Sequence, residues 1–237
     1  MGLLPKRKIE QLKREKRKAK AEKRSNKATR QMAVHFLIVC EGEKTEPNYF
    51  KALIKNTYSE VRKEVIRGEG LGTCDLVNRA KIVKEDLEKK RIIPFDKVWV
   101  VFDKDDFEDF NDAIALCKKY GFHAAWSNQS FELWYYLHFQ LLEAAIDRKD
   151  YIDGLEREIK KHDGYELYKY KKNSDDTYAL LMEIGNEENA KKHALKLREN
   201  FIDNKNYCTH NPCTTVDLLV DELRNPQRVL EEIKNEK

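Results

Sequence analysis

The chain has 237 residues, of which 41% are hydrophobic and 37% are charged, a composition that allows a sizeable core beneath a heavily charged surface. No apolar stretch approaches the roughly 18 to 20 residues of a membrane-spanning helix, and the basic N-terminus lacks the apolar centre of a signal peptide. Five cysteines, an odd number, favour free thiols in a reducing compartment. We therefore expect a cytoplasmic protein with no membrane association.

The positive charge is concentrated at the N-terminus. Residues 1–30 contain thirteen Lys/Arg and three Glu, whereas the whole chain has a net charge of only +4, so the remainder is acidic. Within residues 5–30, Ile9 and Leu12 are the only sizeable apolar residues, too few for a helix that packs on a core. We interpret residues 1–30 as a flexible basic arm that contacts nucleic-acid phosphates, in preference to a tail that only aids solubility. The candidate contacts in this arm are Lys6, Arg7, Lys8, Arg14 and Arg17.

From residue 33 the pattern alternates between strands and helices. Strands are predicted at residues 33–40, 60–67, 97–102 and 122–127, each followed by a helical pattern that begins near residues 45, 73, 109 and 130. Alternation of this kind predicts an α/β fold with a mostly parallel sheet flanked by helices.

Beyond residue 140 the pattern is helical and no further strand is expected. Helices are predicted at residues 150–162, 174–185, 189–202, 214–224 and 226–235. We accordingly divide the chain into a basic arm (1–30), an α/β core (31–142) and a helical C-terminal subdomain (143–237).

Acidic residues follow two of the predicted strands. Glu41 comes directly after the first strand, and Asp103 and Asp105 follow the third. Ligands of parallel sheets bind beyond the carboxyl ends of the strands, so these three side chains converge if the first and third strands are neighbours. Oxygen ligands without histidine or thiolate suit Mg²⁺ or Mn²⁺, and Gly42 would leave room for a metal or phosphate. The alternative for any single acid is a helix cap or a solvated loop residue.

Other candidates carry weaker signals. The stretch "GEKT" does not match a phosphate-binding loop, because Glu43 separates Gly42 from the lysine, so Lys44 is either a phosphate contact or a solvated charge. Glu132 lies in the first turn of the helix after the fourth strand, where a carboxylate favours the helix dipole. Capping is a sufficient explanation for Glu132, and completion of a second metal site is the functional alternative. The group Cys208, His210 and Cys213 lacks the second cluster that a zinc site would need.

Four stretches together resemble one protein family. They are "FLIVCEGEKTEPNYFKAL", "VWVVFDKDDF", "WSNQSFELWYYLHF" and "NPCTTVDLLVDEL", and they are similar to the RloB-like family, whose core resembles the Toprim domain. The resemblance implies a Toprim-like fold in which Glu41, Asp103 and Asp105 bind Mg²⁺ for phosphodiester chemistry. It also implies a role in prokaryotic anti-phage defence of the abortive-infection type, often with an ATPase partner. Gln129 departs from the family, which usually has proline there, and this leaves the shape of that loop open.

The residues and the resemblance together predict a Mg²⁺- or Mn²⁺-dependent nuclease of DNA or RNA, with tRNA among the candidate substrates. Glu41, Asp103 and Asp105 are the expected metal ligands, and Lys44 and Glu132 complete the expected catalytic set. Two alternatives remain open. One is a primase-like nucleotidyl transferase that uses the same metals, and the other is a non-catalytic subunit that senses nucleic acid for an ATPase-containing defence complex.

Overall fold

The computed structural model describes residues 34–55, 61–66, 71–90 and 94–235. The predicted basic arm, with Lys6, Arg7, Lys8, Arg14 and Arg17, lies outside the described residues. Ala33–Lys237 forms one compact unit, and its described residues are not divided at the predicted boundary after residue 142.

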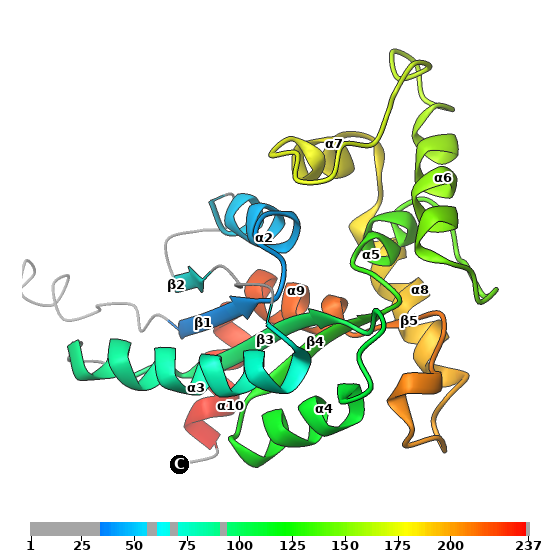
Figure 1. The fold of residues 1–237 in the computed structure, drawn as a ribbon. Coiled ribbons are helices and arrows are strands. Elements are labelled where there is room, and N and C mark those ends of the chain that lie inside the picture. Colours follow the sequence, from blue (N-terminus) through cyan, green and yellow to red (C-terminus); the bar gives the residue numbers. More distant parts are fainter. Residues whose placement is uncertain (1–33, 56–60, 67–70, 91–93, 236–237) are drawn as a thin grey trace, which may run out of the picture. The chain divides into compact units, whose positions relative to one another are not determined.

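The described residues contain a five-stranded sheet with the strand order β2-β1-β3-β4-β5 (Figure 1). The strands are β1 (Val34–Cys40), β2 (Val61–Ile66), β3 (Lys97–Asp103), β4 (His123–Asn128) and β5 (Cys213–Thr214). Strands β2, β1, β3 and β4 run parallel, and β5 pairs with β4 in the antiparallel direction. The predicted mostly parallel sheet is confirmed, and so is the adjacency of the first and third strands. The expectation that strands stop near residue 140 is wrong, because β5 lies at Cys213–Thr214. This strand is only two residues long and therefore shows no strand periodicity in the sequence.

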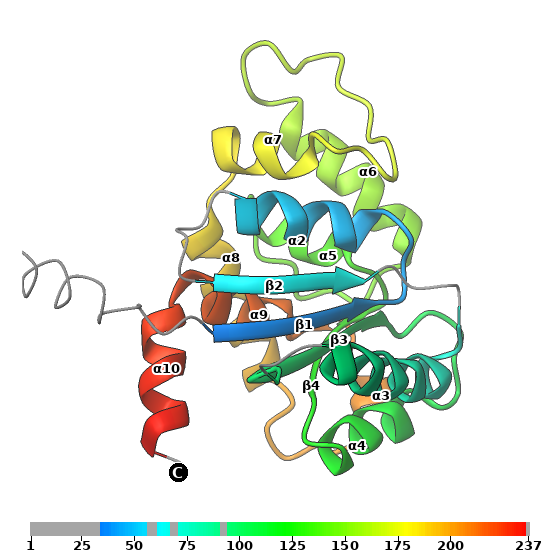
Figure 2. The ribbon, with the colours of Figure 1, turned by 90° about the vertical axis from the view of Figure 1, so that its left-hand side faces the viewer.

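Helices cover both faces of the sheet, as Figures 1 and 2 show. On one face lie α3 (Thr73–Lys90) and α4 (Phe110–Lys119) with the 3₁₀ turn η1 (Tyr207–Thr209). On the other face lie α2 (Thr45–Lys55), α5 (Glu132–Leu137), α8 (Glu187–Glu199), α9 (Val216–Arg224) and α10 (Pro226–Asn235). Farther from the sheet, α6 (Arg148–Ile159) packs on α5 and α7 (Thr177–Ile184) packs on α2 (Figure 2). This arrangement confirms the predicted α/β class, a Toprim-like mostly parallel sheet with a helical C-terminal part. Within the described residues, no helix combines the length and apolarity needed to cross a membrane.

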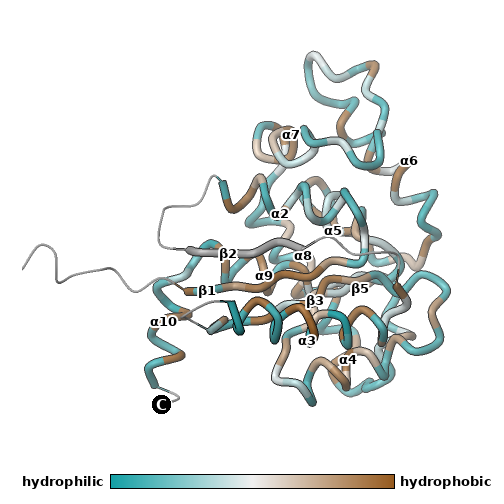
Figure 3. Tube along the Cα trace, turned by 60° about the vertical axis from the view of Figure 1, so that its left-hand side comes forward, coloured by the Kyte–Doolittle hydropathy of each residue, from teal (hydrophilic) through white to brown (hydrophobic). Residues whose placement is uncertain are grey.

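Strand β1 is buried along its whole length because helices pack on both of its faces. Phe36 and Ile38 point into the core beneath α2 and α9, and Leu37 and Val39 point into the core beneath α3 and α4. A strand buried on both faces needs a nearly continuous apolar sequence. Figure 3 shows these apolar residues in brown along β1 and β3.

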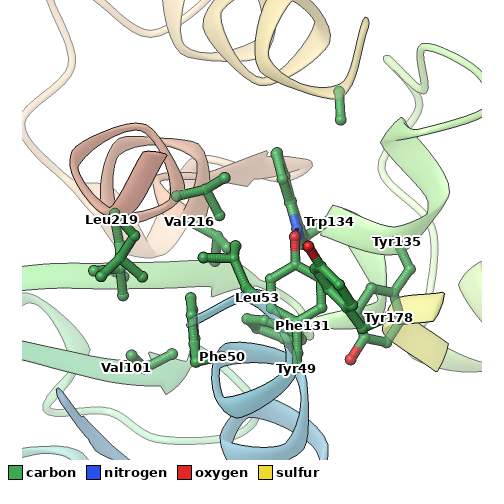
Figure 4. Packing of buried hydrophobic residues seen from close by; sticks show 14 of the residues in the cluster. Tyr49, Phe50, Leu53, Val101, Phe131, Trp134, Tyr135, Tyr178, Val216 and Leu219 are labelled. Atoms are coloured by element: carbon green, nitrogen blue, oxygen red, sulfur yellow. Dashed lines mark hydrogen bonds between the residues drawn. The ribbon is translucent and has the colours of Figure 1, made fainter. Parts of the chain in front are cut away.

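An aromatic cluster joins α2 to α5 next to the carboxyl ends of the strands (Figure 4). The ring of Tyr49 packs against Phe50 and Phe131 at centroid distances of 5.4 and 5.7 Å. The Nε1–H of Trp134 donates a buried hydrogen bond of 2.8 Å to the hydroxyl of Tyr49. Because these rings fix the first turns of α2 and α5 relative to each other, they also set the positions of the carboxylates that these turns carry.

Candidate active site

The backbone at the ends of β1 and β3 brings Glu41 and Asp103 together. The N–H of Glu41 donates to the carbonyl of Val101 at 2.9 Å, which continues the pairing of the two strands by one residue. The N–H of Asp103 in turn donates to Oε2 of Glu41 at 3.2 Å. Asp103 is buried, with 6% of its surface exposed, and Glu41 is half-buried. The sequence prediction that these two acids converge is therefore confirmed.

Asp105 reaches the same region through a turn after β3. Its φ angle is +34°, in the left-handed region that aspartate tolerates better than most residues. Its carboxylate accepts two hydrogen bonds from the Nη1 of Arg148, at 3.0 and 3.3 Å. The Nη2 of Arg148 also lies 3.8 Å from Oδ2 of Asp103. Arg148 was not among the residues singled out from the sequence.

Gln129, in the loop after β4, holds the backbone of Arg148 in place. Its Oε1 accepts a hydrogen bond of 3.0 Å from the N–H of Arg148 at the start of α6. The peptide bond between Asn128 and Gln129 is cis. The hydrogen bond from Arg148 to Gln129 links the loop after β4 to the arginine that faces the acids.

Glu132 is fully buried, and its carboxylate faces the other acids. Oε1 accepts a hydrogen bond of 3.0 Å from the hydroxyl of Tyr170. Oε2 has no hydrogen-bond partner within the described residues, and the Nη2 of Arg148 lies 3.7 Å away. The hydrogen bond to this carboxylate comes from Tyr170 and not from a backbone N–H of the helix, although the position of Glu132 in the first turn of α5 still favours the helix dipole. Capping is therefore not the full account of Glu132.

Glu46 is a member of this group that the sequence analysis missed. It is buried in the first turn of α2, with 5% of its surface exposed, and its Oε2 lacks a hydrogen-bond partner among the described residues. Gly42 makes room for it, since a Cβ added at Gly42 would lie 2.8 Å from Oε1 of Glu46. The space beside Gly42, which the sequence analysis reserved for a metal or phosphate, is thus taken by the Glu46 carboxylate.

One cavity of about 320 Å³ joins these side chains. The acids that line it are Glu41, Glu43, Glu46, Asp103, Asp105 and Glu132. The cavity is also lined by Arg148, Lys172 and Asn173, and by Gly42, Thr45 and Phe131. Asn173 holds the loop between α6 and α7 against α2, because its Oδ1 accepts a hydrogen bond from Thr45 and its carbonyl accepts one from Asn48, both at 3.3 Å. Lys44 is exposed and is not part of the cavity lining, so the structure does not place it with the acids.

Crowding and burial disfavour the charged forms of these acids. Burial raises the pKa of Glu41 to about 7, and the negative charges of Asp105 and Glu46 add to the rise. Burial, with a further contribution from Glu132, raises the pKa of Glu46 to about 6. Burial, Glu46 and Glu132 together raise the pKa of Asp103 well above its usual range. In each case the positive charge of Arg148 opposes the rise, so the cavity favours a cation.

The residues of the cavity fit Mg²⁺ or Mn²⁺ in type. The donor set consists of carboxylate oxygens, which hard divalent cations prefer, and two of these oxygens, on Glu46 and Glu132, are buried without a hydrogen-bond partner in the described residues. In the present arrangement, however, no three His, Cys, Asp or Glu side chains of the described residues are placed to hold a metal ion. The guanidinium of Arg148 supplies the positive charge instead.

In the structure, His210 of the Cys208, His210 and Cys213 group is engaged in contacts within the fold. The ring of His210 stacks on Phe201 at a centroid distance of 4.5 Å, and its Nε2 pairs with the carbonyl of Asn204 at 2.9 Å. All five cysteines are free thiols, as the sequence predicted.

A comparison with protein families gave a match. The model of the family described as RloB-like protein matches residues 36–223, a range that includes every acid of the cavity. Searches of the curated proteins and of the solved structures found no match.

Proposed function

Because the chain belongs to the RloB-like protein family, we propose that it is a Mg²⁺- or Mn²⁺-dependent nuclease that hydrolyses phosphodiester bonds of DNA or RNA. One observation carries the proposal. Carboxylates from the loop after β1, from α2, from β3 and the turn after it, and from α5 line a single cavity at the carboxyl ends of the parallel strands. Buried oxygens of Glu46 and Glu132 have no hydrogen-bond partner in the described part of the chain. Buried carboxylates gathered in this way repel one another unless a cation lies among them.

The ligands follow from the exposure and bonding of each acid. Asp103 and Asp105 are the ligands that we assign to a first ion. Glu46 and Glu132 each have one oxygen without a hydrogen-bond partner in the described residues, and we assign these two oxygens to a second ion. Bound Mg²⁺ or Mn²⁺ would neutralise the phosphate and stabilise the charge that develops on it.

Glu41 is the residue that we assign to proton transfer. Its Oε2 is held by the N–H of Asp103, which leaves Oε1 for the substrate. In the metal-free protein burial raises the pKa of Glu41 to about 7, so this carboxyl group holds a proton more readily than an exposed one, as a general acid must. In the hydrolysis a water oxygen bonds to phosphorus and the bond to one bridging oxygen breaks. Oε1 of Glu41 gives its proton to that leaving oxygen, and the proton of the attacking water passes to the solvent.

Positive side chains near the cavity would hold the substrate. Lys172 is exposed and lines the cavity wall, and Lys44 is exposed in the loop that leads into α2. Together with the arm residues Lys6, Arg7, Lys8, Arg14 and Arg17, these lysines would contact phosphates, which gives affinity without base specificity. Deleting residues 1–30 should therefore weaken binding of nucleic acid and flatten its dependence on salt, as a filter-binding titration at several salt concentrations would measure.

The cellular role that we propose rests on the resemblance to the family. It is anti-phage defence of the abortive-infection type in the cytoplasm of a prokaryote, with an ATPase as partner protein. The catalytic proposal does not depend on this role.

A direct assay tests the catalytic proposal. Purified protein is incubated with DNA, tRNA and bulk RNA in the presence of Mg²⁺, Mn²⁺ or EDTA, and the products are separated by size. The proposal expects shortened strands of at least one substrate with metal and intact strands with EDTA. Incorporation of labelled nucleotide without shortening would favour the nucleotidyl transferase, and binding without any turnover would favour the sensing subunit.

A further inference from the structure

Arg148 lies at the point where three of the acids meet. Its guanidinium makes two hydrogen bonds to Asp105, and its Nη2 lies 3.8 Å from Oδ2 of Asp103 and 3.7 Å from Oε2 of Glu132. These three acids come from β3, from the turn after it and from α5. Two of these acids, Asp103 and Asp105, are the ligands that we assign to the first ion, so the guanidinium takes the place in which that ion would be bound.

The contacts of Arg148 leave the cavity only partly neutralised. The distances to Asp103 and Glu132 exceed a hydrogen bond, and Oε2 of Glu132 remains without a hydrogen-bond partner within the described residues. The close pair with Asp105 is also solvent-accessible, since 33% of the arginine side chain and 39% of the aspartate side chain are exposed. Ion pairs of this exposure contribute little to stability, so a divalent cation can compete for the same carboxylates.

The guanidinium also has space into which it can move. Arg148 forms part of the wall between the acidic cavity and a neighbouring open cavity of about 770 Å³. The second cavity is lined by Asp105, Asp106, Phe107, Gln129, Asp147, Arg148 and Lys149. The backbone of Arg148 is held by Gln129, so a change of side-chain rotamer alone would carry the guanidinium from one cavity towards the other.

We propose that Arg148 is a positioning residue that holds the acids together in the metal-free protein and gives up its place to a divalent cation. This inference rests on the proposed function, because it assumes that the cavity binds such an ion. It explains why no three acids of the described residues are arranged as metal ligands, since they are arranged around the arginine. The released guanidinium remains at the edge of the site, where arginine is well suited to bind a phosphate.

The exchange predicts an effect that a purely structural arginine would not have. If Arg148 and the ion compete, removing the arginine makes the ion bind more tightly, even though it weakens the metal-free protein. Arg148→Gln should tighten Mn²⁺ binding several-fold, on the order of tenfold, which corresponds to about 1.4 kcal/mol. Arg148→Lys should fall between the wild type and the glutamine variant, because lysine keeps the charge without the planar fork.

The test uses the full chain, with Mn²⁺ alone as the probe. Isothermal titration calorimetry gives the dissociation constant for Mn²⁺, and thermal melts with EDTA and with Mn²⁺ give the stabilisation by the ion. The matched control is Lys149→Gln, which removes one exposed charge from the adjacent position of α6 without touching the acids. A general electrostatic effect would shift both variants equally, whereas the exchange predicts a clear gain for Arg148→Gln alone.

The outcomes separate this inference from the proposed function. Tighter Mn²⁺ binding by Arg148→Gln supports the exchange even if the wild type cleaves no nucleic acid, in which case only the proposed function fails. Unchanged or weaker Mn²⁺ binding, in a variant whose melting curve shows a folded protein, overturns the exchange even if the wild type is a nuclease. If Arg148→Gln does not fold, the folded Arg148→Lys variant decides in the same way. Failure of the wild type and both variants to bind Mn²⁺ overturns both ideas.

Discussion

The backbone N–H of Asp103 donates a hydrogen bond of 3.2 Å to the side-chain Oε2 of Glu41. This contact links the end of β3 to the end of β1 and keeps the two acids next to each other. It also orients Glu41, because one carboxylate oxygen is held by the backbone and the other is left for a ligand or a proton.

Replacing Glu41 tests its assigned part in proton transfer. Glu41→Gln keeps the hydrogen bond from Asp103 and the size of the side chain, but it cannot exchange a proton. We expect cleavage to fall by roughly 10²- to 10⁴-fold, the usual range for loss of a general acid or base, while the protein stays folded. Single-turnover cleavage rates measure the loss, with Asp106→Asn, an exposed acid of the neighbouring turn, as the control. Equal rates for Glu41→Gln and the wild type would exclude Glu41 from the chemistry.

The raised pKa values predict how stability depends on pH in the absence of metal. Because the pKa of Glu41 is about 7 and that of Glu46 about 6, against a usual 4.5, the folded protein binds more protons than the unfolded chain between these values. The free energy of unfolding should therefore fall as the pH rises from about 4.5 to about 7. Urea unfolding in EDTA at several pH values measures this slope, which Glu41→Gln should reduce and Glu231→Gln, at an exposed position, should not. Stability that rises through this window would contradict the account.

Gly42 is predicted to be required because Glu46 occupies the space beside it. In Gly42→Ala the new methyl group would overlap the buried carboxylate of Glu46, and we expect a loss of stability of about 1–3 kcal/mol together with a weaker response to Mn²⁺. The control is Gly72→Ala, where the nearest atom to the added Cβ is a ring carbon of Phe107 at 3.8 Å. Thermal melts of both variants with and without Mn²⁺ make the comparison. If the two variants behave alike, the position of Glu46 is not set by Gly42.

Substitutions of two lysines in the loop between α6 and α7 should affect the binding of nucleic acid differently. Lys172 lines the acidic cavity, whereas Lys169 pairs with Glu156 at 3.0 Å and lies outside that lining. Lys172→Ala should weaken binding and reduce the slope of log affinity against log salt by about 0.7 to 0.9, the contribution of one phosphate contact. Lys169→Ala should change this slope much less. Fluorescence anisotropy with labelled oligonucleotides at several salt concentrations measures both, and equal slopes would remove Lys172 from the substrate contacts.

The parts of the fold that were predictable are those with strong local patterns. The apolar runs of β1 and β3 identified two buried strands, and the rule that parallel strands carry ligands at their carboxyl ends placed Glu41 beside Asp103. The two-residue strand β5 was missed because so short a strand has no period, and its pairing with β4 depends on contacts between residues 87 and 85 positions apart, Ser127 with Thr214 and Asn128 with Cys213.

The candidate site was predictable only in part, because some of its residues come together from distant positions in the sequence. Glu46 had a usable signal, since a helix that starts directly after β1 must place its first turn next to the end of that strand. Arg148 had none, because it meets Asp105 from 43 positions along the chain. Lys172 likewise reaches the cavity, and Tyr170 reaches Glu132, through a loop between α6 and α7 whose path the sequence does not specify.

The most direct test of the central claim is the thermal stability of Asp103→Asn with and without a divalent cation. Asp103 is buried among like charges and is only distantly paired with Arg148, so removing its charge should leave the melting temperature in EDTA unchanged or slightly higher. The same substitution should abolish both the stabilisation that Mn²⁺ gives the wild type and the cleavage of nucleic acid. The account would be contradicted if Mg²⁺ and Mn²⁺ left the melting temperature of the wild type unchanged and the Asp103→Asn variant cleaved nucleic acid as the wild type does.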